Sequence, residues 1–362
     1  SKKQVLDSLN ESGLKGKGGA GFPTGKKWEI VSNYNGKKYV AVNGDEGEPG
    51  TFKDRSYLES DPHRFLEGAL IASYFINAQK VYIYMRDEYP TVIKILLDEI
   101  NKMEDEEIIP KDFFIVRRGA GAYICGEESA MIESIEGKRG LPRHRPPYVA
   151  EIGLFGCPTL TNNLETLFWV RDIIEKGAKW FAEKGSNGNK GFHSFSVSGR
   201  VKNPGVKVAP AGITIQQLID EYCDGMADGH TFKGYLPGGA SGGILPATMN
   251  DIPLDYGSKE LMDAGCFLGS AAVVVLSDHD NMKDVALNLL KFFEEESCGQ
   301  CTPCRSGTEK TVKLMQEKNW NKEKLKDLSE VMAQASICGL GQAATNPLNS
   351  VLKYFSNEIT YD

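Results

Sequence analysis

The first half of the chain alternates between short apolar runs and longer amphipathic stretches. Runs rich in β-branched and aromatic residues predict strands at 38–42, 80–85 and 113–116. Apolar residues at helical spacing predict helices at 2–10, 61–76, 90–103 and 126–135. Strands that alternate with helices are typical of βαβ units. We therefore predict an α/β domain with a parallel sheet that carries helices on both faces.

The pattern changes near residue 188. Apolar runs predict strands at 192–201, 206–208, 232–236 and 271–276, around a helix at 214–223. From residue 281 onward, helical spacing predicts helices at 281–296, 305–318, 322–335 and 345–356. We expect a first domain over 1–188, a small mixed β-grasp-like domain over 189–277 and an antiparallel four-helix bundle over 278–362.

Composition excludes several classes of protein. Hydrophobic residues make up 41% of the 362 residues and charged residues 25%, which is ordinary globular usage. The net charge of −7 does not suit a general nucleic-acid binder. The longest apolar run, Ala271–Leu276, is too short to span a membrane, and the N-terminus has no signal-peptide pattern. We expect a cytoplasmic protein, either free in the cytoplasm or attached to the cytoplasmic side of a membrane complex.

Four cysteines form the sharpest chemical signal. Cys298, Cys301 and Cys304 have C-x2-C-x2-C spacing, and Cys338 follows 34 residues later. Three thiolates on one loop with a remote fourth favour a [4Fe–4S] cluster. A four-thiolate zinc site is the main alternative, although zinc prefers two paired C-x2-C arms, and unliganded thiols are another. The other cysteines are scattered and are expected to be small buried hydrophobes: Cys125, Cys157, Cys223 and Cys266.

Two glycine-rich segments could approach a ligand closely. Residues 16–21 match G-x-G-x-x-G, but a predicted helix precedes them, so the standard dinucleotide fingerprint is rejected. The segment is either a flexible surface loop or a backbone cradle for a planar or phosphorylated ligand. Its neighbours Lys17, Lys26 and Lys27 suit a phosphate, and Phe22 offers a stacking face. The second segment, Gly119–Gly121, leads toward a predicted helix whose N–H groups could receive an anion.

An acidic loop, residues 43–50, follows the first predicted strand. It contains Asp45, Glu46 and Glu48, which could form a calcium site, a solvated turn or a ligand loop. Ligands of parallel sheets bind beyond the carboxyl ends of the strands, where this loop lies. The 5 histidines are far apart in sequence and show no metal-binding motif. No Walker loop, G-x-S-x-G or nucleophilic triad is present.

Taken together, the motifs resemble those of one family. The matching segments occur in family order at 16–28, 43–55, 119–129, 158–166, 297–307 and 336–341. They are similar to the NADH-oxidising flavoprotein (51 kDa) subunit family of respiratory complex I. That family includes the diaphorase subunits of NAD-dependent hydrogenases and formate dehydrogenases. The resemblance implies a Rossmann-like domain that binds FMN and NADH, a β-grasp (SLBB) domain and a helical bundle with one [4Fe–4S] cluster.

The resemblance also implies the site residues. The FMN site would comprise Gly16, Gly18, Gly19, Gly21, Lys27, Asn43, Asp45, Glu46, Gly126, Glu127, Asn162, Asn163 and Thr166. The NADH site would comprise Phe22, Glu48, Glu128, Arg145 and Tyr148, with Glu48 as the catalytic residue. The cluster ligands would be Cys298, Cys301, Cys304 and Cys338. Lys17 stands where the family commonly has Arg, and Arg145 where it commonly has Lys, so charge is kept but bidentate geometry is not.

The implied activity is that of an NADH:acceptor oxidoreductase. NADH would deliver a hydride to FMN, and single electrons would then pass through the cluster to partner subunits. Those partners would include a [2Fe–2S] thioredoxin-like subunit and further iron–sulfur subunits, but no nucleic acid and no inserted membrane segment. The alternative is a non-catalytic iron–sulfur relay or scaffold subunit. Quinone, protons, ferredoxin and CO2 remain open as terminal acceptors, as does electron bifurcation.

Overall fold

The computed structural model describes residues 1–119 and 121–361, which form two compact units. The first unit comprises Ser1–Gly47 and Phe52–His193, and the second comprises Glu48–Thr51 and Ser194–Asp362. The main division lies at 193/194, and the sequence-predicted boundary near 188 stays a prediction. The sheet and the helices after it belong to one unit in this division, so the separation near 277 stays a prediction.

A four-stranded parallel sheet forms the centre of the first unit. Its strands are β1 (Tyr39–Gly44), β2 (Lys80–Arg86), β3 (Phe114–Gly119) and β4 (Thr159–Asn163), in the order β3-β2-β1-β4. Val40 pairs with Val81 on one side and Leu160 on the other, and all three side chains are fully buried. The sequence prediction missed β4, because Thr-Leu-Thr-Asn-Asn is short and mostly polar.

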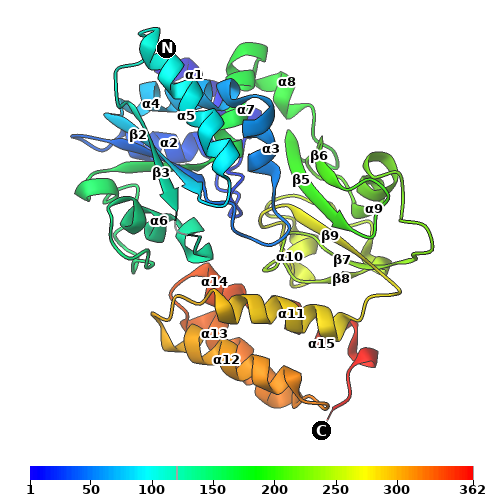
Figure 1. Ribbon diagram of the computed structural model, residues 1–362. Helices are drawn as coiled ribbons and strands as arrows, with labels where there is room; N and C mark the ends of the chain where they lie inside the picture. Colours follow the sequence, from blue (N-terminus) through cyan, green and yellow to red (C-terminus); the bar gives the residue numbers. More distant parts are fainter. Residues whose placement is uncertain (120, 362) are drawn as a thin grey trace. The chain divides into compact units, whose positions relative to one another are not determined.

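Helices cover both faces of this sheet (Figure 1). They are α1 (Lys2–Ser12), α2 (Thr24–Ser32), α3 (Lys53–Ser60), α4 (Pro62–Ile76), α5 (Pro90–Asp105), α6 (Glu128–Ile135), α7 (Leu164–Lys176) and α8 (Ala178–Ala182), with short turns η1 (Tyr123–Gly126) and η2 (Leu154–Gly156). The chain runs from β1 to β3 in one direction and returns past β1 to form β4. Right-handed crossovers then place α4 and α5 on one face and α6 on the other.

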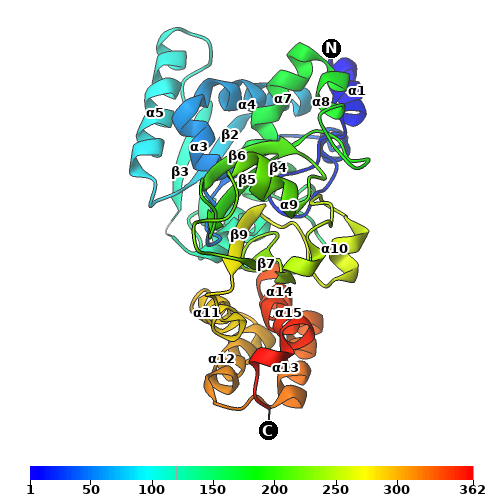
Figure 2. The same ribbon diagram turned by 90° about the vertical axis from the view of Figure 1, so that its right-hand side faces the viewer.

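Apolar faces of α4 and α7 close the larger core of the first unit. The two helices pack side by side (Figures 1 and 2), and their Phe65, Ala69 and Leu167 are fully buried with the sheet valines. Asp61 caps α4 by accepting from the Arg64 N–H, and proline follows at the first helical position. The order of strands reverses beside β1. The carboxyl ends of β1 and β4 therefore flank a topological switch point, where α/β sheets bind ligands.

The second unit begins with a mixed five-stranded sheet of order β6-β5-β9-β7-β8. Its strands are β5 (Phe192–Gly199), β6 (Gly205–Pro210), β7 (Phe232–Leu236), β8 (Leu245–Pro246) and β9 (Ala272–Ser277). β5 pairs parallel with β9, whereas β7 pairs antiparallel with β8 and β9. The expected helix at 214–223 forms as α9 (Ile215–Gln217) continued by a π turn, η3 (Leu218–Tyr222). Shorter elements are η4 (Ala247–Met249) and α10 (Lys259–Asp263).

Helices make up the rest of the second unit. They are α11 (Met282–Glu295), α12 (Thr302–Gln316), α13 (Lys322–Ala335), α14 (Gly339–Ala343) and α15 (Asn346–Tyr354), followed by η5 (Ser356–Glu358). Four of them match the predicted helices, and α14 was not predicted. α12 begins three residues earlier than expected, so Cys304 lies in a helix and not in the loop that the sequence indicated. No helix in the described ranges is long and apolar enough to cross a bilayer.

Candidate functional site

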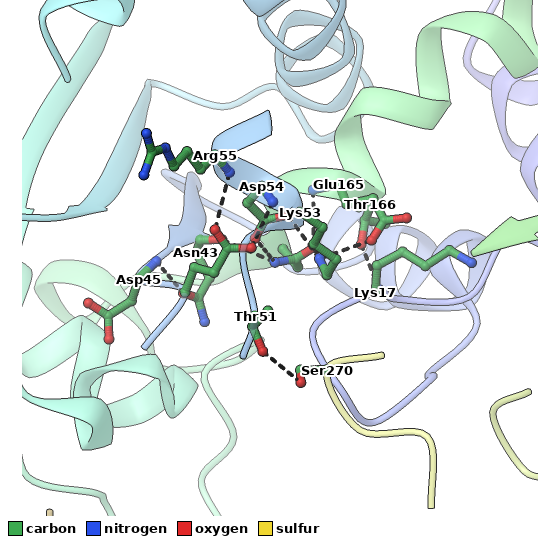
Figure 3. A network of polar contacts seen from close by, with 12 residues as sticks. Lys17, Asn43, Asp45, Thr51, Lys53, Asp54, Arg55, Glu165, Thr166 and Ser270 are labelled. Carbon is green, nitrogen blue, oxygen red and sulfur yellow. Dashed lines mark hydrogen bonds and ion pairs between the residues drawn. The ribbon is translucent and has the colours of Figure 1, made fainter. Parts of the chain in front are cut away.

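Polar side chains gather where β1 and β4 end (Figure 3). Asn43 and Asn163 are register partners on these strands. The Asn43 amide donates to the Gly126 carbonyl at 2.8 Å, and its oxygen accepts from the Asp45 N–H at 3.1 Å. A Cβ added at Gly126 would lie 3.6 Å from the Asp45 carboxylate, so the two segments meet closely. The structure thus brings the predicted flavin residues Asn43, Asp45, Gly126 and Asn163 to one sheet edge.

A buried ion cluster supports this edge from behind. Lys53 Nζ lies 2.8 Å from Asp54 Oδ1 and 2.9 Å from Glu165 Oε2, and all three side chains are almost inaccessible. Asn163 joins the cluster, accepting from Lys53 at 3.3 Å and donating to Asp54 at 2.8 Å. Burial alone would lower the pKa of Lys53, but the carboxylates of Asp54 and Glu165 raise it well above its usual range. The lysine therefore stays charged.

Sequence reasoning gave no role to Lys53, Asp54 or Glu165. All three lie inside the family-like segments 43–55 and 158–166. A usable signal was present: Lys53 and Asp54 precede Tyr57 and Leu58 at helical spacing, so charged residues share the buried face of α3. Glu165 likewise lies on α7 among residues that are nearly all buried.

Glu46 caps α3 from the loop that precedes this helix. Its carboxylate accepts from the backbone N–H groups of Asp54 at 2.7 Å and Arg55 at 3.1 Å, in the first turn of that helix. The Tyr89 hydroxyl donates to it at 3.2 Å. Burial, reinforced by the neighbouring Asp54 carboxylate, raises the pKa of Glu46 to about 8. The expected contact of Glu46 with FMN stays a prediction, while its capping of α3 is a structural role that the sequence did not reveal.

The glycine segment closes into a tight loop. Gly16 N–H donates to the Phe22 carbonyl at 2.8 Å, and the Lys17 N–H donates to the Thr166 hydroxyl at 2.9 Å. A Cβ at Gly18 would lie 3.2 Å from Asn163 Cβ, which is tighter than most real Cβ contacts. Glycine at residue 18 therefore lets the loop lie against the end of β4 without displacing Asn163. Gly19 and Gly21 have positive φ angles of 122° and 63°.

The lysines beside this loop do not form the phosphate cluster that the sequence suggested. Lys17 is only 3% exposed. Its ammonium group donates to the Phe192 carbonyl at 2.6 Å and lies 2.8 Å from His193 Nδ1. Lys27 pairs with Glu128 at 3.3 Å, and Lys26 is exposed. Lys17 thus holds the end of the first unit together and is not directed at a ligand.

The two acids that begin α6 have different neighbours. Glu127 is the N-cap and accepts from the N–H groups of Ser129 and Ala130, each at 3.0 Å, while Arg145 pairs with it. Glu128 accepts from the Thr161 hydroxyl at 2.7 Å and pairs with Lys27 and, at 3.5 Å, with Arg145. Burial alone would raise the pKa of Glu128, but Lys27, Thr161 and Arg145 together lower it. Glu128 is therefore ionised but compensated.

The remaining predicted residues of the first unit differ in exposure. Asn162 is buried and accepts from the Trp28 indole N–H at 2.8 Å, which links β4 to α2. Phe22 and Tyr148 are 43% and 56% exposed, so both rings are accessible for stacking.

Glu48 belongs to the segment Glu48–Thr51, which is part of the second unit. Its Oε1 accepts from the Ser241 N–H at 3.1 Å and the Ser241 hydroxyl at 2.8 Å. Burial raises the pKa of Glu48 above its ordinary value, and the hydrogen bonds from Ser241 oppose that rise.

The four motif cysteines come together in the second unit. Cys301 and Cys338 are the residues immediately before α12 and α14, and Cys304 lies in the first turn of α12. Burial is the main cause that raises the pKa of the Cys304 thiol to about 11. The nearby sulfurs of Cys301, Cys338 and Cys298 contribute to this rise. The Ser297 hydroxyl lies 3.3 Å from the Cys304 sulfur. Because the other three sulfurs lie near enough to raise the pKa of Cys304, the four cysteines form a candidate metal centre.

The arrangement of the four cysteines suits a cubane. Three come from one C-x2-C-x2-C segment and the fourth from the residue before α14, so each thiolate could bind a different iron. The Ser336 hydroxyl is buried without a hydrogen-bond partner in the described chain, and a Cβ at Gly341 would touch both this oxygen and Cys304 Cβ. The Ser336 hydroxyl is thus available to donate a hydrogen bond to a bound cluster.

The other cysteines are mostly as expected. Cys125, Cys223 and Cys266 are buried, and burial raises the pKa of Cys223 and Cys266. Cys157 is the exception, because it is only partly buried.

Comparison with known proteins finds a matching family domain over each of the two regions that hold these residues. Residues 9–172 match the Nuo51 FMN-binding domain, and residues 284–362 match the NADH-ubiquinone oxidoreductase-F iron–sulfur binding region. The chain is 41% identical to the second F-type subunit of NADH-quinone oxidoreductase from Rhizobium meliloti, over 98% of this chain and 87% of that protein. The chain belongs to the family of F-type subunits of NADH-quinone oxidoreductase. It carries that family's FMN-binding domain and iron–sulfur region.

Similar proteins are also found outside bacteria and among solved structures of a hydrogenase. The mitochondrial NADH dehydrogenase [ubiquinone] flavoprotein 1 of Dictyostelium discoideum is 39% identical over 99% of this chain and 78% of that protein. A crystal structure of NAD⁺-reducing [NiFe]-hydrogenase in the H2-reduced state aligns with a TM-score of 0.91 at 34% identity. That alignment covers 99% of this chain but 62% of the hydrogenase chain. The fold class predicted from sequence is therefore confirmed.

The residues at the strand ends fit a flavin. The FMN-binding match includes β1, β4, the glycine loop and α6. Carboxamides of Asn43, Asn162 and Asn163 offer both donors and acceptors, as a flavin edge requires. The close approach at Gly18 leaves backbone, rather than side chain, facing the end of β4.

Proposed function

We propose that this subunit takes electrons from NADH at an FMN held by the first unit and passes them on through a [4Fe–4S] cluster in the second. The observation that carries this proposal is the convergence of Asn43, Asp45, Gly126 and Asn163 at the switch point of the parallel sheet. A redox chain needs both the flavin and the cluster. Bound flavin accepts the electron pair of a hydride and releases the electrons one at a time, and a cluster accepts single electrons.

In this proposal the residues of the first unit position the ligands. Asn43, Asp45, Asn162, Asn163 and Thr166 would hold the flavin together with the glycine loop and the Gly126–Glu127 turn. The buried Lys53 cluster fixes Asn163 and the start of α3, so the strand-end loop is pre-organised. Phe22 and Tyr148 would stack on NADH, and Arg145, Glu128 and Glu48 would contact it.

In the second unit, Cys298, Cys301, Cys304 and Cys338 would each bind one iron. The N-terminus of α12 lies at Cys301, and the helix dipole there favours the thiolate form. Binding of iron would remove the thiol protons, including the one that burial holds on Cys304. Ser297 and Ser336 would donate to sulfur.

We also propose the partners that complete the path. The hydrogenase structure and the quinone-reducing relatives both belong, by their names, to systems that couple NAD to a second acceptor. Electrons from this chain would leave to a [2Fe–2S] thioredoxin-like subunit and further iron–sulfur subunits. The localisation proposed is cytoplasmic, including attachment on the cytoplasmic side of a membrane complex.

The test is anaerobic titration of the holoprotein with NADH. Bleaching of flavin absorbance near-stoichiometric with NADH, together with NADH-driven reduction of benzyl viologen, is the expected result. A relay or scaffold subunit would contain iron but would neither retain FMN nor be bleached by NADH. That outcome would replace the proposed activity with the alternative role.

A further inference from the structure

Two histidines and an aspartate meet at one edge of the second sheet, away from every motif used above. The ligand atoms of His230, Asp278 and His279 all lie within 4.8 Å of one another. The sequence gave no sign of this, because His230 lies 48 and 49 positions before the other two. The antiparallel pairing of β7 with β9 brings them together. Phe232 is the partner of Ser277, so residues just before β7 lie opposite residues just after β9 (Figure 1).

Backbone hydrogen bonds fix both segments. The Thr231 N–H donates to Asp278 Oδ1 at 2.8 Å, and the Asp278 N–H donates to the Thr231 carbonyl at 3.0 Å. One carboxylate oxygen of Asp278 is thus held by the backbone, which leaves the other oxygen to bind a ligand. The rings of His230 and His279 have their centroids 4.6 Å apart.

A second layer of contacts sets the form of His230. Ser277 Oγ, which is fully buried, donates to Asp280 Oδ2 at 3.3 Å and accepts from the His279 N–H at 3.2 Å. His230 Nδ1 lies 2.9 Å from the same oxygen. Because the Ser277 proton is directed to Asp280, the hydrogen bond runs from Nδ1–H of His230 to Ser277. His230 Nε2 then keeps its lone pair free for a metal ion.

Asp280 is itself fixed by a fork from Arg200, with nitrogen–oxygen distances of 2.8 and 3.2 Å. The chain Arg200–Asp280–Ser277–His230 resembles the outer-shell arrangement that orients metal-binding histidines in general. This support fixes the ring of His230, which is only partly exposed.

We propose that His230, Asp278 and His279 bind a divalent first-row transition ion of the Zn²⁺ class. Two imidazoles and one carboxylate suit such an ion and not Ca²⁺ or Mg²⁺, which take oxygen ligands. Bonds of about 2.0–2.2 Å require the ligand atoms of a tetrahedral site to be about 3.3–3.5 Å apart. Side-chain rotations that move the ligand atoms by roughly 1 Å would therefore close the site. His279 and Asp278 are exposed and have room for this movement. Three protein ligands leave one position for water or an incoming ligand.

The bound ion would clamp the start of β7 to the connection between β9 and α11. That connection is short, because Asn281 already caps α11 by accepting from the Asp284 N–H at 3.1 Å. The site thus lies at the joint between the sheet and the helices that carry the cysteines.

Equilibrium dialysis of the cluster-loaded holoprotein against Zn²⁺, with metals counted by mass spectrometry, tests the proposal. We expect one zinc per chain in addition to about four irons. His279→Ala and Asp278→Asn should weaken zinc binding at least about tenfold, and Ser277→Ala about 10–100-fold through the orientation of His230. His63→Ala is the matched control, because His63 is exposed and pairs with Glu99 elsewhere; its zinc affinity should equal that of the wild type.

X-ray absorption at the zinc edge then identifies the ligands. Nitrogen and oxygen neighbours with an imidazole pattern would support the site. Sulfur neighbours at about 2.3 Å would overturn it, since zinc would then occupy the cysteines. Equal zinc uptake by the wild type and by folded His279→Ala, with iron and FMN contents unchanged in both, would also overturn it. Because iron and FMN are counted in the same samples, this result is independent of NADH oxidation.

Discussion

At the residue scale, the strand-end loop derives its shape from hydrogen bonds that begin at Asn43. That side chain ties the Gly126 turn to the loop and orders the Asp45 backbone. Asp45 itself is only 2% exposed, which is unusual for an acid in a loop. Such burial is consistent with the proposed role of Asp45 in binding FMN and not with a role in solubility.

Asp45→Ala should therefore weaken FMN retention. The loss of one buried charged hydrogen-bond acceptor costs about 1.5–3 kcal/mol, or roughly ten- to 150-fold in the dissociation constant. FMN per chain after gel filtration is the measurement, with exposed Asp98→Ala on α5 as the control. Full retention of flavin by Asp45→Ala would assign the loop another task.

Glu128 tests the choice of NADH over NADPH. A carboxylate near the adenosine ribose repels a 2′-phosphate. Lys27 and Arg145 partly compensate the charge of Glu128, so we expect the lower end of the effect. Glu128→Gln should lower the NADH:NADPH ratio of kcat/KM by roughly fivefold, about 1 kcal/mol, mainly by improving NADPH. Glu133→Gln on the same helix is the control, and an unchanged ratio in Glu128→Gln would direct attention to Glu48.

At the element scale, α3 depends on residues that precede and follow it in the chain. Glu46 caps its first turn from the loop after β1, and Lys53 in that turn is enclosed by Asp54 and by Glu165 of α7. α3 is thus fixed to the sheet edge by charges more than by its short apolar face.

Removing the central cation should be costly. Lys53→Met leaves Asp54 and Glu165 buried without a partner charge, and breaking a buried ion pair in this way destabilises by about 3–5 kcal/mol. Urea unfolding followed by tryptophan fluorescence measures this. The control is Lys94→Met on α5, where the lysine is exposed and the change should be within about 0.5 kcal/mol. Similar unfolding midpoints for the two variants would show that the cluster contributes little.

Glu46 should make stability depend on pH. Its pKa is about 8 in the folded protein, and about 4.3 is usual for an unfolded chain. The folded state therefore binds the proton more tightly, and ionisation of Glu46 lowers the free energy of unfolding as pH rises from about 4.3 toward 8. Glu46→Gln cannot ionise, so its stability relative to the wild type should increase between pH 5.5 and pH 8. Urea unfolding at both pH values, with excess FMN, is the measurement; the exposed Glu106→Gln should show no such trend.

At the scale of the whole molecule, the proposed flavin residues and the motif cysteines lie in different compact units, and Glu48, proposed to contact NADH, belongs to the same unit as the cysteines. Each unit has its own core: the valine-rich sheet core of the first, and Val197, Val273 and Val275 of the second. Loss of one cofactor should consequently leave the other in place.

Cys304→Ala and Cys338→Ala should separate the two cofactors. Each variant lacks one thiolate, and a cubane needs all four corners held, so iron should fall well below about four per chain. FMN content should stay at the wild-type level, while NADH-driven reduction of acceptors that draw on the cluster falls sharply. Cys157→Ala is the control, since this cysteine is remote from the motif in sequence and partly exposed. Wild-type iron in both motif variants would remove these residues from the ligand set.

The sequence by itself determined what depends on local pattern. Periodicity was enough for β1, β2, β3 and most helices, and the spacing of Cys298, Cys301 and Cys304 favoured the iron–sulfur region that the family comparison shows. It failed for β4, whose polar Thr and Asn residues form a strand only because β1 lies beside it.

Only the tertiary structure decided how distant residues use their polar groups. Lys17 looked like a phosphate ligand until the fold placed His193 and the Phe192 carbonyl against its ammonium group. The closure of the loop after β1 lets Glu46 cap α3. The pairing of β7 with β9 brings His230 close to His279. The physical reason is that a side chain's charge and hydrogen-bonding capacity are local, whereas the partners that satisfy them in a low-dielectric interior come from anywhere in the chain.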